Sequence, residues 1–226
     1  MKRLIQTIPI LGPALTRLAR AARRTSRAFP GSEAYWERRY QSGGDSGAGS
    51  YSRLAEFKAE ILNELVRERS FRTVIEFGSG DGHQLTLASY PSYIGFDVSE
   101  NAISRCRSRF AGDGAKAFRL VKDYAGERAD LTLSLDVVYH LVEDAVFHDY
   151  MARLFDAADR CVVVYASNTD QNPDPRPAHV RHRKFTSWVE ANRPAWRLAR
   201  HIPNRYPDTG DPRTGSFADF FIFEKT

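Results

Sequence analysis

The sequence predicts an α/β fold in which a mostly parallel sheet is flanked by helices. Short apolar strands alternate with helical segments from residue 73 onward, and the first strand runs into a glycine-rich turn. The last two strands have no helix between them, so they should be antiparallel. The 226 residues, 42% apolar and 12% aromatic, suffice for one domain with a sizeable core.

The alternation can be followed along the chain. Five strands are short apolar runs that end at polar or glycine-containing turns: Thr73–Phe77, Ser92–Asp97, Ala117–Val121, Leu131–Leu135 and Cys161–Ala166. Helical patterns stand between and after them at Ser99–Phe110, Glu143–Ala158 and Thr186–Ala191, with weaker helical character at His83–Ser89. Ser99 is expected to cap its helix. The final strands are Trp196–Ile202 and Phe217–Phe223.

Residues 1–30 form a basic N-terminal arm. They hold seven basic residues and no acid, so the remaining 196 residues carry −2 of the chain's net charge of +5. Leucines at helical spacing among the arginines suit a helix on an anionic membrane surface, while a solvated extension or a helix packed on the domain fits the pattern too. A domain that binds nucleic acid spreads positive charge over its body, so we expect no such partner.

Residues 31–70 are expected to form a helical cap. Ser32–Tyr40 has the pattern of a helix with Ser32 as its N-cap, and Tyr51–Arg69 that of a long amphipathic helix. Residues 41–50 between them are almost all Gly, Ser and Asp, which is typical of a linker or of a lid over a site, and a lid is favoured beside a cofactor domain. Three aromatic residues of the first helix would close over that site or simply pack: Tyr35, Trp36 and Tyr40.

Two cysteines indicate a reducing compartment. Cys106 and Cys161 give neither a disulfide framework nor a metal-ligand spacing, and Cys161 has the setting of a small core residue. No apolar run approaches the ~20 residues of a membrane span, and Leu4–Leu18, broken by prolines and a glycine, makes a poor signal peptide. We expect a cytoplasmic protein, with the arm as a peripheral contact at the inner face of the membrane.

The stretch VIEFGSGDGHQL carries the chemistry. Glycines at 78, 80 and 82 cannot continue the strand before them, and they let a ligand approach the main chain closely. The next strand ends in Asp97, 19 positions after Gly78, where an acid is placed to hold two ribose hydroxyls. The alternative for Asp97 is an acid that caps a turn. Together the turn and the acid predict a cofactor that contains a nucleoside.

The spacing of the glycines identifies the cofactor class. A dinucleotide site has the order G-x-G-x-x-G, but position 83 is His. Two acids, Glu76 and Asp81, flank the turn, and acids suit an ammonium group better than a pyrophosphate. With EFGSGDG, GFDVS and LSLDVVYHL, the chain from about Phe71 to Thr226 resembles the class I S-adenosylmethionine-dependent methyltransferases.

The resemblance implies a Rossmann-like, doubly wound sheet of seven strands with S-adenosylmethionine as cofactor. Glu76 would meet the amino group of the cofactor, Asp97 the ribose and Val98 the adenine. The rest of the turn, Gly78, Ser79, Gly80 and Gly82, would hold the methionine end. Asp136 would lie at the cleft edge beside the methyl group. Asp123 would receive the adenine amino group, unless it is a plain loop acid.

The methyl acceptor is less constrained, and we expect a small-molecule or sugar-type compound. A hydroxyl acceptor needs a base, for which His140 follows the fourth strand and His182 the fifth. His140 could equally cap local structure or line the cofactor pocket. The basic run HVRHRK suits an anionic acceptor, or it is a solvated loop. The rival functions are an NAD-dependent oxidoreductase and a membrane-associated cofactor-binding module without catalysis.

Overall fold

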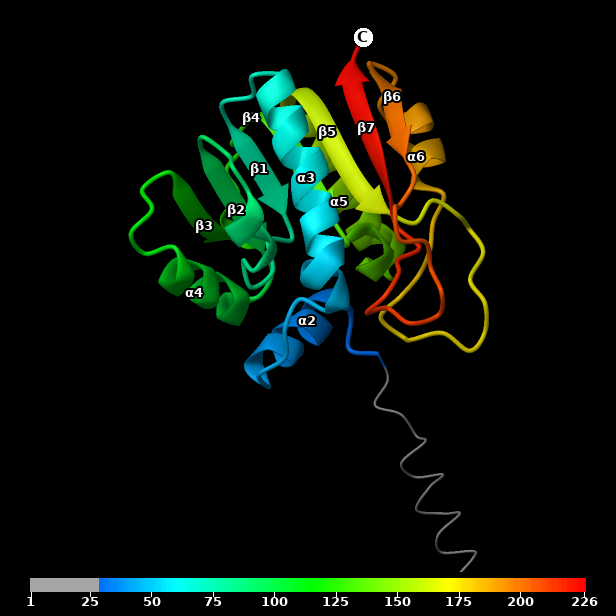
Figure 1. Ribbon diagram of the computed structural model, residues 1–226. Coiled ribbons are helices and arrows are strands. Elements are labelled where there is room, and N and C mark those ends of the chain that lie inside the picture. The colour runs from blue at the N-terminus through cyan, green and yellow to red at the C-terminus, as the bar shows by residue number, and fades with distance from the viewer. Residues whose placement is uncertain (1–28) are drawn as a thin grey trace, which may run out of the picture. The chain divides into compact units, whose positions relative to one another are not determined.

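The computed structural model describes residues 29–226, of which Gly31–Thr226 form one compact unit (Figure 1). The basic arm expected for residues 1–30 therefore lies almost wholly outside the described residues. Within them the chain forms a seven-stranded sheet with strand order β3-β2-β1-β4-β5-β7-β6. The strands are β1 Val74–Phe77, β2 Tyr93–Asp97, β3 Lys116–Leu120, β4 Ala129–Leu135, β5 Ala158–Ala166, β6 Trp196–Ile202 and β7 Asp219–Lys225.

The sheet is mostly parallel, as the sequence predicts. β1 pairs in parallel with β2 and β4, and the parallel pairing continues outward to β3 on one side and β5 on the other. β7 is antiparallel to both of its neighbours, β5 and β6, which confirms the expected antiparallel end. The parallel strands consequently end at the same edge of the sheet, where α2 lies in Figure 1.

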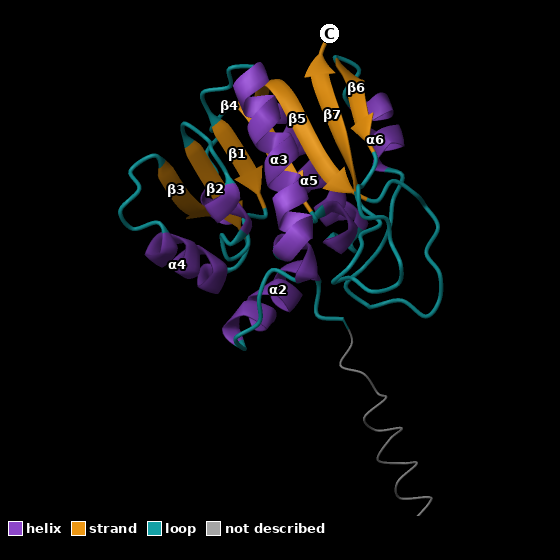
Figure 2. Ribbon diagram, viewed as in Figure 1, coloured by secondary structure: helices purple, strands orange, loops and turns teal. Residues whose placement is uncertain are grey.

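Helices cover both faces of the sheet (Figure 2). They are α2 Ser32–Gln41, α3 Ser52–Glu68, α4 Glu100–Arg109, α5 Asp144–Asp156 and α6 Phe185–Asn192. Residues of α3 and α4 share one core cluster, and residues of α5 and α6 share the other. Because successive side chains of a strand point to opposite faces, Val162 joins the second of these clusters and Val163 the first. The Rossmann-like, doubly wound architecture is thus confirmed.

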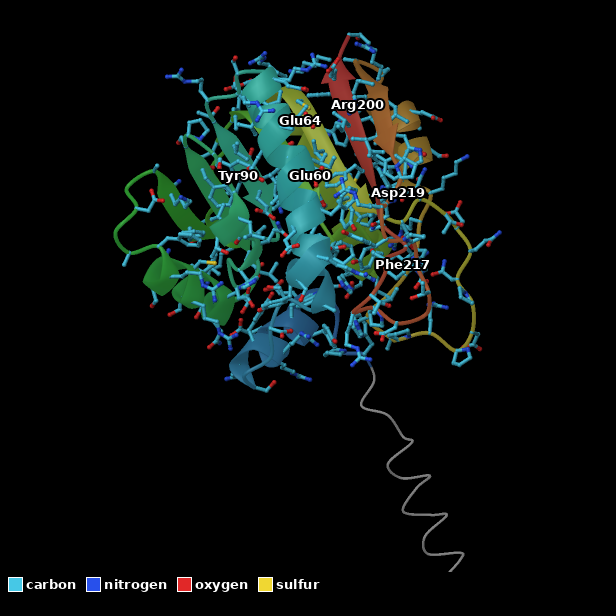
Figure 3. All side chains as sticks on the ribbon, in the orientation of Figure 1. Glu60, Glu64, Tyr90, Arg200, Phe217 and Asp219 are labelled. Carbon is cyan, nitrogen blue, oxygen red and sulfur yellow. The ribbon has the colours of Figure 1, made fainter. Side chains whose placement is uncertain are left out.

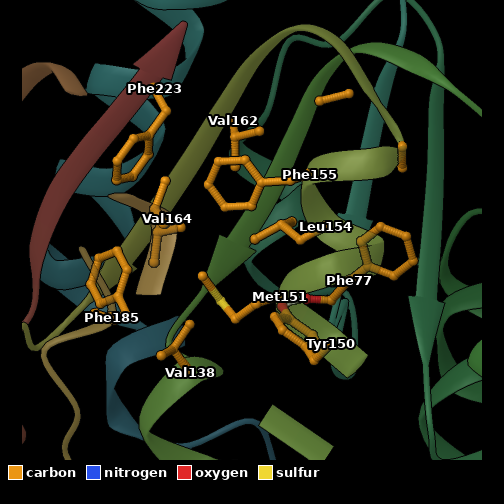
Figure 4. Packing of buried hydrophobic residues seen from close by; sticks show 14 of the residues in the cluster. Phe77, Val138, Tyr150, Met151, Leu154, Phe155, Val162, Val164, Phe185 and Phe223 are labelled. Carbon is orange, nitrogen blue, oxygen red and sulfur yellow. Dashed lines mark hydrogen bonds between the residues drawn. The ribbon is translucent and has the colours of Figure 1, made fainter. Parts of the chain in front are cut away.

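The core on the α5 side is tightly packed (Figure 4). Met151 and Leu154 of α5 are fully buried, and they lie among strand residues such as Val162 and Val164. On the opposite face, the apolar stripe of α3 is buried to a similar degree. α3 is therefore part of the core of the domain rather than a detachable cap, and the cap-like part of residues 31–70 reduces to α2 and the loop after it.

Several local expectations were wrong. Ser32 is the first residue of α2 rather than its N-cap, which is Gly31. The Ser32 hydroxyl instead accepts from the Val142 amide and donates to Glu143 Oε2 at 2.6 Å, so tertiary contacts hold it. The weak helical character of His83–Ser89 corresponds to a short 3₁₀ helix, Gln84–Leu87, and not to an α-helix. The Ser99 cap is confirmed, since its hydroxyl accepts from the Ala102 amide.

Both cysteines are structural. Burial raises the pKa of the Cys106 and Cys161 thiols to about 12, so neither is a ready nucleophile. Among residues 29–226, no cluster of His, Cys, Asp or Glu could hold a metal ion. No helix in the same residues has the length and apolar character needed to cross a membrane.

Candidate active site

The candidate site lies at the carboxyl edge of the sheet, between β1 and β4. The chain proceeds from β1 to β2 on one side and from β4 to β5 on the other, so the strand order reverses at this point. Open α/β sheets bind their ligands in the crevice at such a reversal. The glycine turn follows β1, Asp97 ends β2, and Asp136 follows β4, so the residues expected to bind the cofactor converge here.

The glycine turn bends sharply over the end of β2. The amides of Gly78 and Ser79 both donate to the Phe96 carbonyl, at 2.7 and 3.1 Å. Gly80 has φ +57°, a conformation that costs other residues free energy. A Cβ atom at Gly80 would stand 2.3 Å from Ser46 Oγ and 3.0 Å from the Tyr40 hydroxyl. Gly80 therefore presents bare main chain to the segment between α2 and α3.

The other turn residues face the protein. A Cβ atom at Gly78 would stand 2.4 Å from Val137, and one at Gly82 would stand 2.9 Å from Cys106 on α4. These two glycines thus permit close packing on either side of the turn. Ser79 is buried, and its hydroxyl has no hydrogen-bond partner in the described part of the chain. A buried hydroxyl of this kind at a ligand-binding turn is suited to a group that the bound ligand supplies.

Asp97 is buried and braces the turn. Its Oδ2 accepts from the Gly80 amide and its Oδ1 from the Ser99 amide, both at 2.9 Å. Burial raises its pKa to about 6, although those amides act in the opposite direction. These contacts are those of the turn-capping alternative. Each carboxylate oxygen has two lone pairs, so these contacts do not use up the capacity of Asp97 to accept hydrogen bonds from ribose hydroxyls.

Glu76 is likewise buried, within β1. Its Oε2 accepts from the Tyr93 hydroxyl at 2.6 Å. Burial raises its pKa to about 7, while the Tyr93 hydrogen bond and the Lys58 ammonium act against that rise. Asp97 and Asp136 lie close enough to raise the same pKa further. Glu76 thus belongs to a cluster of three carboxylates.

One buried lysine faces this cluster. The Lys58 side chain on α3 is 1% exposed, and its Nζ lies 2.6 Å from Asp136 Oδ2. Asp136 has φ +60° and also accepts from the Tyr139 hydroxyl at 2.8 Å. Within this group, three carboxylates therefore meet a single ammonium. Such a balance favours a ligand that brings positive charge.

The segment after α2 covers the glycine turn. Asp81 Oδ2 accepts from the Tyr51 hydroxyl at 2.7 Å and from the Ser46 amide at 3.2 Å. Ser46 Oγ in turn accepts from the Asp81 amide at 2.9 Å. Burial tends to raise the pKa of Asp81, but the hydrogen bonds from Tyr51, His83 and Ser46 outweigh it and lower the pKa. An ionised Asp81 thus binds this segment to the turn.

The same segment reaches from α4 to Asp136. Arg105 on α4 donates to the carbonyls of Tyr40 and Gly44, both at 2.6 Å. At the other end, a Cβ atom at Gly49 would stand 2.8 Å from Asp136 Oδ2. Residues 42–51 therefore lie over the reversal point of the sheet, which is where the lid alternative expects them.

Val98 and Asp123 lie at the rim of the site. Val98 is 36% exposed directly after Asp97, which leaves an apolar surface beside the expected ribose position. Asp123 is exposed in the 3₁₀ helix Val121–Asp123 that follows β3. No hydrogen bond holds the Asp123 carboxylate to another described residue, so its contacts do not separate a cofactor ligand from a loop acid.

His140 is enclosed by aromatic rings. Its Nδ1 lies 2.8 Å from the His179 carbonyl, and the rings of Trp36 and His179 lie 4.9 and 5.3 Å away between centroids. Burial lowers its pKa to about 4, although the His179 carbonyl works against this. His140 is therefore neutral near pH 7. A histidine that acts as general base near neutral pH would titrate close to its ordinary pKa, and we do not expect such a titration of His140.

His182 stands beside an open cavity. Its Nδ1 lies 2.6 Å from Ser167 Oγ at the end of β5, and it lines a cavity of about 590 Å³ with Ser167 and Phe217. Burial lowers its pKa, with a further contribution from the charge of Arg176. With Nδ1 bound to Ser167, Nε2 is the nitrogen left for a ligand. Tyr139 connects the two histidines, since its ring lies 4.5 Å from His140 and 6.3 Å from His182.

The arginines of the basic run serve the fold. Arg181 and Arg183 both form ion pairs with Asp144 at the start of α5, at 2.9 and 3.0 Å. Arg183 also donates to the carbonyls of Leu141 and Val142. These guanidinium groups are thus occupied within the protein, so the anion-binding surface expected from this run is not formed by them.

Four residues of the site were missed in the sequence. Lys58 had a usable signal, because it stands four residues after Leu54 and four before Leu62, on the apolar face of α3. Ser46, Tyr51 and Ser167 carried none, since their roles depend on segments that meet only in the folded chain: Ser46 and Tyr51 with Asp81, and Ser167 with His182.

No known protein-family profile matches the sequence, and no curated protein sequence matches it. Solved structures do resemble the fold. The N-methyltransferase NodS of Bradyrhizobium japonicum, with S-adenosyl-L-homocysteine, is 14% identical with a TM-score of 0.66, over 86% of this chain and 98% of NodS. Magnesium protoporphyrin IX methyltransferase of Synechocystis, with bound S-adenosylmethionine, is 14% identical with a TM-score of 0.63, over 89% of this chain and all of that one.

A third similar structure is the methyltransferase domain of bacterial Hen1. It is 19% identical with a TM-score of 0.58, over 76% of this chain and 100% of that domain. The three proteins share with this chain the arrangement of the sheet and its helices. The protein therefore has the fold of the class I S-adenosylmethionine-dependent methyltransferases.

Proposed function

We propose that the protein is an S-adenosylmethionine-dependent methyltransferase that methylates a hydroxyl group of a small-molecule or sugar-type acceptor. The observation that carries the proposal is the charge balance at the reversal point of the sheet. Glu76, Asp97 and Asp136 lie there with a single buried ammonium, that of Lys58. S-adenosylmethionine, when bound, supplies a methyl group on a cationic sulfur and brings an ammonium group as well.

The residues present fit this cofactor. The Ser79 hydroxyl at the glycine turn is buried and has no hydrogen-bond partner among residues 29–226, and the Gly80 main chain at φ +57° is covered by the Ser46 segment that would act as the lid. We assign Glu76 to the amino group, Asp97 to the ribose hydroxyls and Val98 to the adenine. The turn residues Gly78 and Gly82 would let the methionine end of the cofactor come close to the main chain. Asp136 would border the methyl group, and Asp123 is the candidate for binding the adenine amino group.

Residues 42–51 would act as the lid of this site. Their hydrogen bonds to Asp81 and their contact with Gly80 place them over the turn that the cofactor needs. A lid of this kind excludes water from the reaction and must open for ligand exchange. We expect S-adenosylhomocysteine to slow amide exchange in residues 42–51 more than in α5. Equal slowing in both segments would contradict a lid.

Of the two candidate bases, the surroundings favour His182. Its Nε2 can take a proton from an acceptor hydroxyl in the adjoining cavity, whereas His140 is enclosed by Trp36, Tyr139 and His179. His182→Ala should slow single-turnover methyl transfer by ~10²–10⁴-fold and leave cofactor affinity unchanged. His140→Ala should disturb the pocket instead, with weaker cofactor binding and an unaltered form of the pH profile. A His182→Ala rate within tenfold of the wild type would refute the assignment.

The two rival functions are disfavoured by the same site. A pyrophosphate of NAD at the glycine turn would meet Asp81, whose lowered pKa keeps its carboxylate ionised. A binding module without catalysis has no need of the cavity beside His182. The near-neutral body of the domain argues against a nucleic-acid acceptor.

The experiment is methyl transfer to a metabolite extract. Full-length protein is incubated with extract and cofactor carrying a trideuterated methyl group, and mass spectrometry follows the label. We expect labelled small molecules with the wild type and a strong loss of label with Asp97→Ala. Label on protein or nucleic acid alone, or no label while the cofactor binds, would contradict the proposal.

A further inference from the structure

The cavity beside His182 opens between the loop after β5 and the loop between β6 and β7. Its volume of about 590 Å³ lies in the range of sites for small molecules. Tyr139 lies between the cavity and Asp136. Its hydroxyl donates to the Asp136 carboxylate at 2.8 Å, and its ring lies 4.9 Å from the ring of Phe217, which lines the cavity. The cavity is therefore one side chain away from the place assigned to the methyl group.

One wall of the cavity is apolar and exposed. Phe217 is 43% exposed and Leu198 45% exposed, and together they make two of the five large exposed hydrophobic residues in the described part of the chain. Figure 3 shows Phe217 and Asp219 close to each other where the chain enters β7. The Phe217 ring meets that of His182 edge-on, at 4.8 Å and 90°. Exposed apolar groups gathered in a concave surface mark a binding site, and a flat ring suits the C–H face of a saturated ring.

Another part of the cavity lining is polar and carries negative charge. Side chains with hydroxyl or amide groups line it, namely Ser167, Asn168, Thr169 and Gln171. The carboxylates are Asp208, which accepts from the Gly210 amide, and Asp219, which lies 2.8 Å from His201 Nε2 and accepts from the Asn204 amide. No lysine or arginine is among the described residues that line the cavity.

We infer that this cavity binds the methyl acceptor, and that the acceptor is a polyhydroxylated, ring-shaped molecule without negative charge, held on Phe217 with one hydroxyl at His182 Nε2. The inference rests on the proposed function and narrows its substrate class. Amide and hydroxyl side chains match several ligand hydroxyls at once. Asp208 and Asp219 oppose a carboxylate or phosphate, because like charges at short range repel each other.

The test measures binding as well as turnover. Full-length protein saturated with S-adenosylhomocysteine is titrated with the methyl glycosides of glucose, galactose and mannose, and with their uronates, which replace one CH₂OH by a carboxylate. Backbone NMR shifts of residues around Ser167 and Phe217 report the site and the affinity. We expect at least one neutral glycoside to bind there and its uronate to bind at least about tenfold more weakly.

Matched variants identify the cause. Phe217→Ala should weaken the neutral glycoside about tenfold, while Val146→Ala, at a 42% exposed position on α5, should not. Asp208→Asn should reduce the discrimination against the uronate to about threefold, while Asp149→Asn, exposed on α5, should leave it unchanged. Thermal unfolding of each variant confirms that it is folded.

The outcomes separate this inference from the proposed function. A uronate that binds as tightly as its neutral partner, or no neutral glycoside that shifts the cavity residues, overturns the acceptor class while S-adenosylhomocysteine still binds. Failure of S-adenosylhomocysteine to bind, measured by calorimetry on the same samples, overturns the proposed function. Glycoside binding in the cavity would then still be read directly from the NMR shifts.

Discussion

Replacing Lys58 by methionine removes the ammonium group buried beside Asp136, Glu76 and Asp97. The Lys58 side chain is 1% exposed and that of Asp136 13% exposed, so the carboxylate left behind gains little hydration. Breaking a buried ion pair by removing one partner costs about 3–5 kcal/mol. We expect about 3 kcal/mol, at the lower end, because Asp136 keeps its hydrogen bond from Tyr139. Methionine and lysine have similar helix propensity, so α3 itself should be unaffected.

Urea unfolding at pH 7.5 measures the effect. The control is Lys122→Met, since Lys122 and Glu100 form an exposed pair at 3.2 Å with side chains 68% and 71% exposed. Such a pair contributes at most about 1 kcal/mol. Adding Asp136→Asn to Lys58→Met should recover part of the loss, because the uncompensated charge is then gone. A Lys58→Met variant that loses no more stability than Lys122→Met, or a double variant that shows no coupling, would contradict this expectation.

Four further predictions concern the cofactor site and the arm. Gly80→Val should lower S-adenosylmethionine affinity at least 100-fold by calorimetry while most of the fold remains, because the turn needs φ +57° at this position and a Cβ there would collide with Ser46 Oγ and displace the segment that covers the turn. The folded pKa values of Glu76 and Asp97, about 7 and about 6, lie above their ordinary values, so the stabilising contribution of these two carboxyl groups in the free protein should be lost as the pH rises through 4 to 7, whereas His140, whose pKa is lowered to about 4, contributes in the opposite direction. Urea unfolding of the wild type and of Glu76→Gln over this range isolates the contribution of the Glu76 carboxyl group. A cationic cofactor favours the ionised carboxylates, so its affinity should rise with pH over 5.5 to 7.5 with release of protons. Deleting residues 1–30, with their seven basic residues, should reduce sedimentation with anionic vesicles at low salt and leave methyl transfer unchanged.

Three of these predictions have a clear contrary result. Gly112→Val, at a glycine with open space around its added Cβ, is the control for the turn, and equal affinities in the two variants would make the Gly80 turn merely structural. An affinity for the cofactor that stays flat from pH 5.5 to 7.5 would show that Glu76 and Asp97 do not face positive charge. Equal vesicle binding of the full-length and shortened chains at low salt would exclude the arm as an anchor.

The sheet could be predicted because its signals are local. Each strand is a short apolar run between turns. The glycines and Asp97 together indicate two neighbouring parallel strands with a ligand-binding turn between them, within 20 residues. Strand limits shifted by a few residues where pairing decided them: β5 begins at Ala158 rather than Cys161, because Ala158 pairs with Ala129. Ser32 differs from its prediction for a related reason. It is a good N-cap residue in sequence, but its hydroxyl forms hydrogen bonds with Val142 and Glu143, which are distant in the chain.

The site was only partly predictable. Glu76 and Asp97 follow from spacing, but the burial of Lys58 against Asp136 depends on how α3 lies on the sheet. The basic run HVRHRK suggested an anionic acceptor, because a sequence does not show which groups pair with its charged residues. In the fold, both arginines of the run form ion pairs with Asp144. Ser167 and His182 form a hydrogen-bonded pair, but a proline-rich loop separates them in the sequence. No local sequence pattern therefore predicts the contact.

The most direct test of the central claim is a calorimetric titration of the full chain at pH 7.5, with S-adenosylmethionine and with NADH, repeated on Asp97→Ala. We expect binding of S-adenosylmethionine, little or none of NADH, and a loss of about 1–3 kcal/mol of binding free energy in the variant, because two ribose hydroxyls lose their charged partner. Tighter binding of NADH, or unchanged S-adenosylmethionine affinity in a folded Asp97→Ala variant, would contradict it.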